Sequence, residues 1–458
     1  MSGNEPSFPA TKVVVVMVPF VAQGHLTQLY HLSHLISTYN LPVHFVSTTD
    51  CIRQVRSRHH TTTAVNFHEF TVPPFTSPPP NPSTPYPTHL QPLFNSTLHL
   101  RHPTATLIRH LSQHVQKVVV IHDVLMSYVV QDVKLIPNAE TYVFQPPPAF
   151  YISSRHWERT GGSGPFPVEP ELMKRLPSQD GATSPEFLKF AALQKPDMNH
   201  VGELYDSSRV IEGKFFEYLE KEEKKKIWAV GPLNPVHIAS NATGLKNRHR
   251  CLQWLDKQPA KSVIYVSFGT TTTFSDQQIR ELALGLERSG QRFVWVVRVA
   301  DTGDSVGFEE RKVELPDGFE ERVRGRGLIE RSWAPQLEIL GHFATGGFMS
   351  HCGWNSSMES MSMGVPIAAW PMHSDQPRNA FLITDVLRIG IPMKNWERRN
   401  ELVKANVVAE AVKTLMGSEE GEEMRRRAMK LGAEVKESVA EGGVSHREME
   451  SFISYICS

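Results

Sequence analysis

Short runs of apolar, β-branched residues alternate in the first half of the chain with longer segments of helical periodicity. Lys12–Val18, Val43–Thr48 and a run ending at Asp123 are continuous and short, which is typical of strands buried on both faces of a parallel sheet. From about Leu26 the apolar positions fall on one face of a predicted helix: Leu29, Leu32, Leu35 and Ile36. Repetition of this strand–loop–helix–strand unit predicts a doubly wound sheet.

The pattern starts again in the second half of the chain. Val263–Gly269 reads as another buried strand, and Ser275 and Gln278 form a capping box that opens a helix running through Arg288 to Gly290. Further strands are predicted in FVWVV, GGFMS and VPIAAW. The sequence therefore predicts two Rossmann-like α/β domains that face each other across a cleft. Loops at the carboxyl ends of their strands are expected to line this cleft.

We expect a first domain over residues 1–235, a linker over 236–250 and a second domain over 251–440. The last segment, 441–458, is predicted to be a helix that packs back on the first domain. Residues 73–92 contain nine prolines and predict an irregular surface loop, which either borders a pocket or is plain surface. The charge run Glu220–Lys226 reads as a solvated helix face rather than a binding patch.

Composition narrows the classes of function. The 458 residues are enough for two cores, and 48 Lys and Arg balance 48 Asp and Glu, so no net charge favours nucleic acid or a membrane surface. The four cysteines lie far apart without metal-ligand spacing, which suits a reducing compartment. The polar N-terminus lacks the pattern of a signal peptide. We expect a cytoplasmic monomer without a bound metal or other cofactor.

The segment Trp333–Gln376 has the side chains that a nucleotide diphosphate sugar requires. Trp333 offers a flat face for a base, and the stretch from His351 through Asn355 enters a helix whose N-terminus favours phosphate. Glu359 lies one turn further and can accept hydrogen bonds from ribose hydroxyls. At the end of the segment stand acceptors and donors suited to a sugar: Asp375 and Gln376.

This segment resembles, without a gap, the 44-residue signature of the plant family 1 glycosyltransferases that act on secondary products. Other motifs agree with that family in order and spacing: PFVAQGH, VGPL, CLQWLDKQPAKSVIYVSFGT and LPDGFEER. The resemblance extends over nearly the whole chain. It implies a GT-B fold, a UDP-sugar as co-substrate and a small hydroxylated acceptor.

Residue by residue, the resemblance implies a role for each position of the donor site. Trp333 stacks on uracil, and Gln336 and Glu359 hold the ribose. The diphosphate is held by His351, Asn355, Ser356 and Thr270. The sugar is held by Trp354, Asp375 and Gln376. In this family, a glutamine at the position of Gln376 is usually associated with glucose as the donor sugar. Trp354 is open to a second interpretation, a structural role beside the sugar.

The predicted catalytic pair is His25 with Asp123. His25 lies where the first strand has ended, and an imidazole can take the proton of an acceptor hydroxyl near neutral pH. Asp123, at the end of a neighbouring strand, can orient the ring and stabilise its protonated form. The acceptor then attacks the sugar from the face opposite UDP, with inversion. The sequence contains no D-x-D, so a metal clamp on the diphosphate is not expected.

Departures from the family pattern indicate a subfamily. Gln28 stands where many relatives have proline, and GHLTQLYHLSHL, VVVIHDVLMSYVVQD and NAETYVFQ are similar to zeatin O-glucosyltransferases. Relatives of those enzymes use UDP-xylose or act on flavonoids, so UDP-glucose and UDP-xylose both stay open as donors. Candidates for the acceptor pocket are three aromatic residues, Phe20, Phe94 and Phe150, of which Phe94 and Phe150 could equally fill the core.

Two other classes of function compete with the transferase. A binding protein for a hormone or a nucleotide sugar would have the same fold without turnover, but His25, Asp123 and the donor signature are all intact. A dinucleotide oxidoreductase would need a G-x-G-x-x-G after a strand, which is absent from the sequence. The motifs, rather than the fold, favour the transferase.

Overall fold

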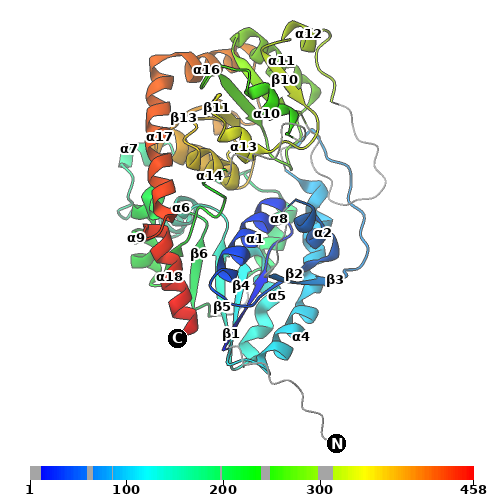
Figure 1. The fold of residues 1–458 in the computed structure, drawn as a ribbon, viewed down its shortest axis with the longest axis vertical. Helices are drawn as coiled ribbons and strands as arrows, with labels where there is room; N and C mark the ends of the chain where they lie inside the picture. The colour runs from blue at the N-terminus through cyan, green and yellow to red at the C-terminus, as the bar shows by residue number, and fades with distance from the viewer. Residues whose placement is uncertain (1–11, 59–64, 85, 196–198, 239–247, 298–312) are drawn as a thin grey trace, which may run out of the picture.

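The computed structural model describes residues 12–58, 65–84, 86–195, 199–238, 248–297 and 313–458. Most of the predicted linker 236–250 lies outside these residues. The two halves of the chain form two parallel sheets, one in the lower and one in the upper part of Figure 1. Among the described residues, no helix is long and apolar enough to cross a membrane.

The first sheet has seven parallel strands in the order β3-β2-β1-β4-β5-β6-β7. Their bounds are Val13–Val18 for β1, Val43–Thr48 for β2, Val65–Phe70 for β3, Lys117–Asp123 for β4, Ala139–Gln145 for β5, Gly202–Tyr205 for β6 and Lys226–Ala229 for β7. All six residues of β1 are buried, as its β-branched run predicted. The strand order reverses between β1 and β4, so the crevice for a ligand opens at their carboxyl ends.

Helices cover both faces of this sheet (Figure 1). The helices of this half of the chain are α1 (Gln23–Ser37), α2 (Thr49–Arg58), α3 (Gln91–Ser96), α4 (Arg101–Ser112), α5 (Ser127–Val130), α6 (Ala149–Arg159), α7 (Pro170–Met173), α8 (Pro185–Leu193) and α9 (Arg209–Glu223). Short 3₁₀ turns link several of them: Thr88–Leu90, Thr97–Leu100, Val124–Met126 and Gln131–Leu135.

The second sheet has six parallel strands in the order β10-β9-β8-β11-β12-β13. Their bounds are Val263–Ser267 for β8, Arg292–Val296 for β9, Gly327–Glu330 for β10, Thr345–Ser350 for β11, Ile367–Ala369 for β12 and Gly390–Pro392 for β13. Here the order reverses between β8 and β11, and Ser267 is paired with Ser350 where these strands end. Each domain therefore presents a switch point at which a ligand can bind.

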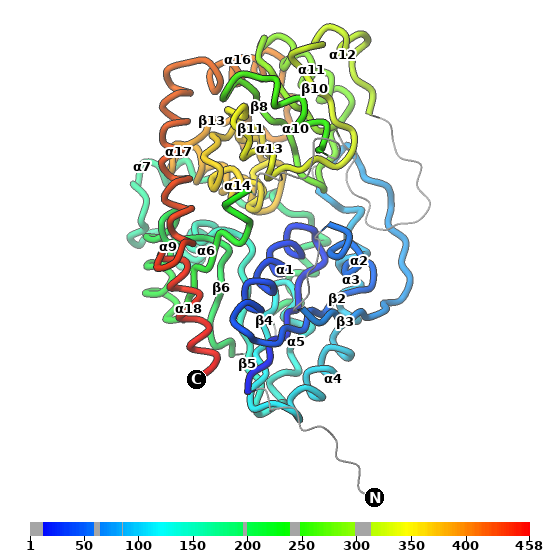
Figure 2. Tube along the Cα trace, viewed as in Figure 1, coloured from blue at the N-terminus to red at the C-terminus, as the bar shows by residue number. Residues whose placement is uncertain are grey.

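The helices of the second half are α10 (Arg250–Leu255), α11 (Asp276–Ser289), α12 (Phe319–Arg322), α13 (Gln336–Leu340), α14 (Trp354–Ser362), α15 (Gln376–Phe381), α16 (Ala405–Gly417), α17 (Glu419–Val439) and α18 (Val444–Cys457). A π-helical turn spans Leu382–Val386, and a 3₁₀ turn spans Trp396–Arg398. Figure 2 shows α17 and α18, in orange and red, running along both halves, where α17 contacts α9 and α18 contacts β7. The chain thus returns to the first sheet at its C-terminal end.

A candidate sugar-transfer site between the two sheets

His25 and Asp123 meet at the switch point of the first sheet. The register pairs Val18 of β1 with His122 of β4, so Asp123 ends β4 directly beside the loop that leads from β1 into α1. His25 lies in the first turn of α1, and its Nδ1 is 2.6 Å from Oδ2 of Asp123. The other carboxylate oxygen accepts a hydrogen bond from the backbone N–H of Leu125 at 2.8 Å, which holds the Asp123 side chain in place.

The surroundings of His25 set its protonation. Burial lowers the pKa of the imidazole, but the charge and hydrogen bond of Asp123, together with the charge of Asp375, outweigh that effect and raise it above its ordinary value. Asp123 is fully buried, whereas the His25 side chain is 24% exposed. Because Nδ1 donates to the carboxylate, Nε2 carries the free lone pair when the ring is neutral. The pair thus presents a base to the cleft.

Aromatic rings back the imidazole. Phe20 packs edge-on against His25, with ring centroids 5.3 Å apart, and Phe20 also contacts Phe94 and Phe190. Phe150 lies elsewhere: it is fully buried among Phe166, Phe215 and Phe381. Phe20 therefore lies beside His25 with Phe94 behind it, and both rings are also buried in the core of the first domain. The structure places Phe150 in the core, the other position that its sequence context allowed.

Gln336, Ser356 and Glu359 form one hydrogen-bonded group, although 23 positions separate the first from the last. The Gln336 amide donates to Ser356 Oγ at 2.9 Å and to Glu359 Oε2 at 2.7 Å. Burial raises the pKa of Glu359 to about 7. Helices α13 and α14 thus bring together the two residues that the resemblance assigns to the ribose, Gln336 and Glu359.

His351 lies between two glycines at the switch point of the second sheet. A Cβ on Gly269 would lie 2.8 Å from the imidazole, and a Cβ on Gly353 would lie 2.4 Å from its Nε2. Burial lowers the pKa of His351 to about 4, so the ring is neutral at physiological pH. Its Nδ1 is buried and has no hydrogen-bond partner among the described atoms. An oxygen atom of a ligand bound at the N-terminus of α14 would give this nitrogen a hydrogen-bond partner.

Two residues that are not glycine have left-handed backbone at this site. Cys352, between β11 and α14, has φ of 63°, and Ser374, just before α15, has φ of 59°. Such conformations cost energy and persist where the surrounding structure requires them. Asp375 follows Ser374, and its Oδ2 accepts from Asn379 at 2.7 Å. The adjacent Gln376 is held by its own loop, because its Oε1 accepts from the backbone of residues 372 and 373.

Trp354 and Asn355 both bond to the first domain. The Trp354 indole N–H donates to the backbone oxygen of Asp206 at 2.7 Å, and the Asn355 amide donates to that of Gly24 at 2.8 Å. Trp354 is almost completely buried, which fits a structural role beside the sugar. Asn355 fixes the first turn of α14 next to His25. These two bonds hold the N-terminus of α14 against the first domain, next to His25.

Trp333 presents its indole to solvent, with 57% of its surface exposed. Its backbone oxygen accepts a hydrogen bond from His249 Nε2 at 3.1 Å. His249, Cys251 and Glu330 are the types of residue that bind metals, and they lie close together. However, His249 Nδ1 accepts from the Cys251 backbone N–H at 3.2 Å, so a neutral ring carries its proton on Nε2 and offers no lone pair there. The group braces Trp333.

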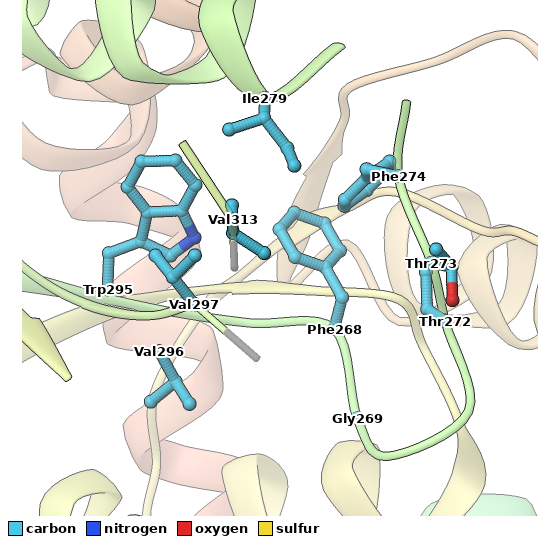
Figure 3. A pocket seen from close by; sticks show the side chains of 10 residues that line it. All are labelled: Phe268, Gly269, Thr272, Thr273, Phe274, Ile279, Trp295, Val296, Val297 and Val313. Carbon is cyan, nitrogen blue, oxygen red and sulfur yellow. The ribbon is translucent and has the colours of Figure 1, made fainter. Parts of the chain in front are cut away.

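A pocket lies behind the loop that follows β8, and Figure 3 shows its lining. Apolar side chains of Phe268, Phe274, Ile279 and Trp295 surround the space, and the loop contributes Thr272 and Thr273. Both threonine hydroxyls are buried without a partner among the described atoms. The half-buried Thr270 precedes them on the same loop and follows Gly269, which approaches His351. The loop therefore lines this apolar pocket with Thr272 and Thr273 and approaches His351 at Gly269.

Comparisons with known proteins agree with this geometry. Residues 11–235 match the family described as "Glycosyltransferase, N-terminal domain", and residues 229–432 match "UDP-glucoronosyl and UDP-glucosyl transferase". A zeatin O-glucosyltransferase of Phaseolus lunatus is 51% identical over 100% of both chains. A zeatin O-xylosyltransferase of Phaseolus vulgaris is 49% identical over 97% of this chain and 98% of its own.

The chain belongs to the UDP-glycosyltransferase family. It is a transferase enzyme that uses a UDP-sugar and a small acceptor. Among solved structures, a glycosyltransferase of Phytolacca americana complexed with UDP-2-fluoro-glucose and pterostilbene aligns with a TM-score of 0.76 and 26% identity. That alignment covers 98% of this chain and 100% of the other. The predicted arrangement of two Rossmann-like domains, of GT-B type, is confirmed.

Several residues of this glycosyltransferase site were not found from the sequence. Gly24 and Asp206 contribute only backbone oxygens, which any residue type offers, so no pattern marks them. Arg378 is completely buried although its residue type is usually exposed, and only the fold reveals its partners. Asn379 links Asp375 to the backbone oxygen of Cys352 at 2.9 Å. Asn379 follows the signature closely, and this position is the one signal in the sequence that could have indicated its role.

Proposed function

We propose that the enzyme transfers glucose from UDP-glucose to the side-chain hydroxyl of a zeatin-type cytokinin, with inversion and without a metal. The observation that carries the mechanism is the 2.6 Å contact between His25 and Asp123. Asp375 of the other domain lies close enough for its negative charge to act on His25 as well. The acceptor is inferred from the two bean relatives, whose names specify zeatin.

In this mechanism, His25 Nε2 takes the proton of the acceptor hydroxyl as its oxygen attacks the anomeric carbon of the sugar. The bond from that carbon to the diphosphate breaks on the opposite face, and UDP leaves with the electron pair. The proton stays on His25, whose positive charge Asp123 stabilises across 2.6 Å. Attack opposite to departure inverts the anomeric configuration.

We assign the donor contacts to the side chains around α14. Trp333 stacks on uracil, Gln336 and Glu359 hold the ribose, and Asp375 and Gln376 hold the sugar. The diphosphate is held by the residues at the N-terminus of α14 and the facing loop, namely His351, Asn355, Ser356 and Thr270. A neutral His351 with an unpartnered Nδ1, together with the helix dipole, stabilises the leaving diphosphate in place of a metal.

We also propose the domain division 1–235, 236–250, 251–440 and 441–458, with a monomer as the active unit. Phe452 of α18 packs edge-on against Tyr142 and Trp228 of the first sheet. Arg209 of α9 pairs with Glu448 of α18 at 2.5 Å. Both sides of the site come from one chain, so a second copy is not needed to complete it.

UDP-xylose is the alternative donor, because the xylosyltransferase relative is nearly as similar as the glucosyltransferase. The test measures UDP release and product mass with each donor, with EDTA present. The acceptors are trans-zeatin, cis-zeatin, dihydrozeatin and a set of flavonoids. We expect turnover of a zeatin with UDP-glucose. Turnover of flavonoids alone contradicts the acceptor, turnover with UDP-xylose alone contradicts the donor, and loss of all activity in EDTA contradicts the metal-free mechanism.

A further inference from the structure

A completely buried arginine crosses between the two domains beside the sugar end of the donor site. Arg378 lies on α15, and its relative exposure is 0%. One terminal guanidinium nitrogen donates to Ser154 Oγ at 2.8 Å and the other to Glu158 Oε1 at 2.5 Å. Both partners belong to α6 of the first domain, and Nε of Arg378 donates to the Pro177 backbone oxygen at 3.4 Å. All three nitrogen atoms therefore bond across the interface.

Such a position is costly unless each donor is satisfied. Removing a guanidinium from water carries a large desolvation penalty, which only a well-formed set of hydrogen bonds and a counter-charge offset. Glu158 supplies the counter-charge and is itself 42% exposed. Loss of Glu158 would leave Arg378 buried without its carboxylate. The interface therefore depends on this pair being intact.

Arg378 lies in the same helical turn as the residues assigned to the sugar. Asp375 occupies the N-cap position of α15 and Gln376 is the first residue of the helix, so Arg378 follows them within one helical turn. Asn379 then bonds to Asp375 and to the Cys352 backbone oxygen, which connects the same turn to the loop of His351. A shift of Arg378 would move both sugar residues as one unit.

The other end of the link is equally well held. The carboxylate of Glu212 accepts from the backbone N–H groups of Ala149 at 3.0 Å and Phe150 at 2.7 Å, which fixes the N-terminus of α6. Phe150 of α6 stacks on Phe381 of α15, with ring planes 11° apart. Helix α6 is therefore a fixed support of the first domain, and Arg378 joins α15 to it.

We propose that Arg378 is a positioning residue for sugar transfer, which holds Asp375 and Gln376 against the catalytic face of the first domain. The inference rests on the proposed function, because it assigns these two residues to the donor sugar. The residues assigned to UDP, such as Trp333, Glu359 and His351, lie on other elements, and the bonds of Arg378 go to α6 and to the Pro177 backbone instead. Affinity for UDP-glucose and the turnover rate should therefore depend on Arg378, whereas affinity for UDP should not.

The test compares Arg378→Met, Arg378→Lys and Glu158→Gln with wild type. A misplacement of about 1 Å at the reacting atoms costs roughly 100-fold in rate, so we expect Arg378→Met to lower kcat/KM for the donor by about that factor. We expect Glu158→Gln and Arg378→Lys to give smaller losses of about tenfold. The dissociation constant of UDP, measured by calorimetry, should stay within about twofold of wild type in all three variants.

The matched control is Arg175→Met. Arg175 also pairs across the interface, with Asp385 at 2.6 Å, but its side chain is 66% exposed. Asp385 is largely buried, but Arg175 itself is exposed and lies outside the residues assigned to the donor, so this variant should keep wild-type kinetics. Equal loss of UDP and UDP-glucose affinity in the Arg378 variants would overturn the proposal in favour of a general structural role.

Unchanged kcat/KM in Arg378→Met and Glu158→Gln would also overturn it. Glu158→Gln keeps the inference testable if Arg378→Met does not fold, because Glu158 is partly exposed. Failure of the proposed function would look different: wild-type protein would then show no sugar transfer at all.

Discussion

At the scale of single residues, the site depends on side chains whose protonation is set by their neighbours. His25 has its pKa raised by Asp123 and Asp375, whereas burial alone lowers that of His351 to about 4. The first imidazole can therefore accept and hold a proton, and the second stays neutral, as its proposed contact with the diphosphate requires. Two histidines in one cleft thus take different roles because only one has a buried carboxylate as partner.

The pH dependence of Asp123→Asn tests this difference. His25 must be neutral to act as a base, so kcat/KM of wild type falls as pH drops through the raised pKa of His25. Removal of the negative charge of Asp123 lowers the pKa of His25, so the acid limb of the pH profile of kcat/KM should move to lower pH. The maximal rate should fall by about 100-fold or more, because the ring loses its orienting acceptor. An acid limb at the wild-type pH in the variant would contradict the role of Asp123.

At the scale of secondary-structure elements, periodicity predicted most strands and the main helix cap. β2 spans the predicted Val43–Thr48, and the Ser275 side chain accepts from the Gln278 N–H as expected. The capping box is incomplete, however, since the Gln278 amide bonds to the backbone of Val403 instead. Distant partners of this kind cannot be found from local spacing.

Two boundaries also differ from the sequence prediction. α1 begins at Gln23 rather than near Leu26, because its first turn faces the cleft and so lacks the apolar residues that mark a buried helix face. The proline-rich segment 73–92 is irregular at first, but short helices begin at Thr88 and Gln91, where Pro92 fits the first turn. The signature predicts a set of donor-site residues, which stays a prediction, whereas the bonds of Asn355 to Gly24 and of Trp354 to Asp206 could be found only from the fold.

A substitution in the loop before α14 tests the position of His351. The φ of Gly353 is −59°, which alanine adopts without strain, so a Cβ acts only through its 2.4 Å approach to His351 Nε2. We expect Gly353→Ala to displace the imidazole and weaken UDP binding by about tenfold, which corresponds to one lost hydrogen bond to a charged group. Calorimetry with UDP measures this effect.

Gly213→Ala is the control for that experiment. A Cβ at Gly213, within α9, meets nothing closer than 4.0 Å. Alanine there should leave UDP affinity unchanged and raise stability by roughly 0.5–1 kcal/mol. Equal UDP affinity in Gly353→Ala and wild type would show that His351 does not hold the diphosphate.

At the scale of the whole molecule, the last two helices join the two halves. α17 continues from the second domain and contacts α9, and α18 covers the edge of the first sheet (Figure 2). Phe452 is fully buried there against Tyr142 and Trp228. The domains are therefore connected at this edge as well as across the cleft, where Arg378, Trp354 and Asn355 bond to the first domain.

Phe452→Ala tests this connection. Truncation of a buried phenylalanine costs about 3–5 kcal/mol, so the midpoint of urea unfolding should fall markedly. The matched variant Tyr455→Ala removes a half-buried ring of the same helix, which contacts Trp228 with centroids 5.4 Å apart, and should cost less. Equal unfolding midpoints for Phe452→Ala and wild type would show that α18 does not stabilise the first domain.

The central claim is that His25, paired with Asp123, is the base of an inverting sugar transfer. The most direct measurement is the rate of glycoside formation by His25→Ala with UDP-glucose and trans-zeatin, beside His34→Ala, which changes an exposed histidine of the same helix. We expect His25→Ala to lose about 100- to 10,000-fold in kcat while UDP affinity is unchanged, and His34→Ala to match wild type. Wild-type turnover by His25→Ala would contradict the mechanism.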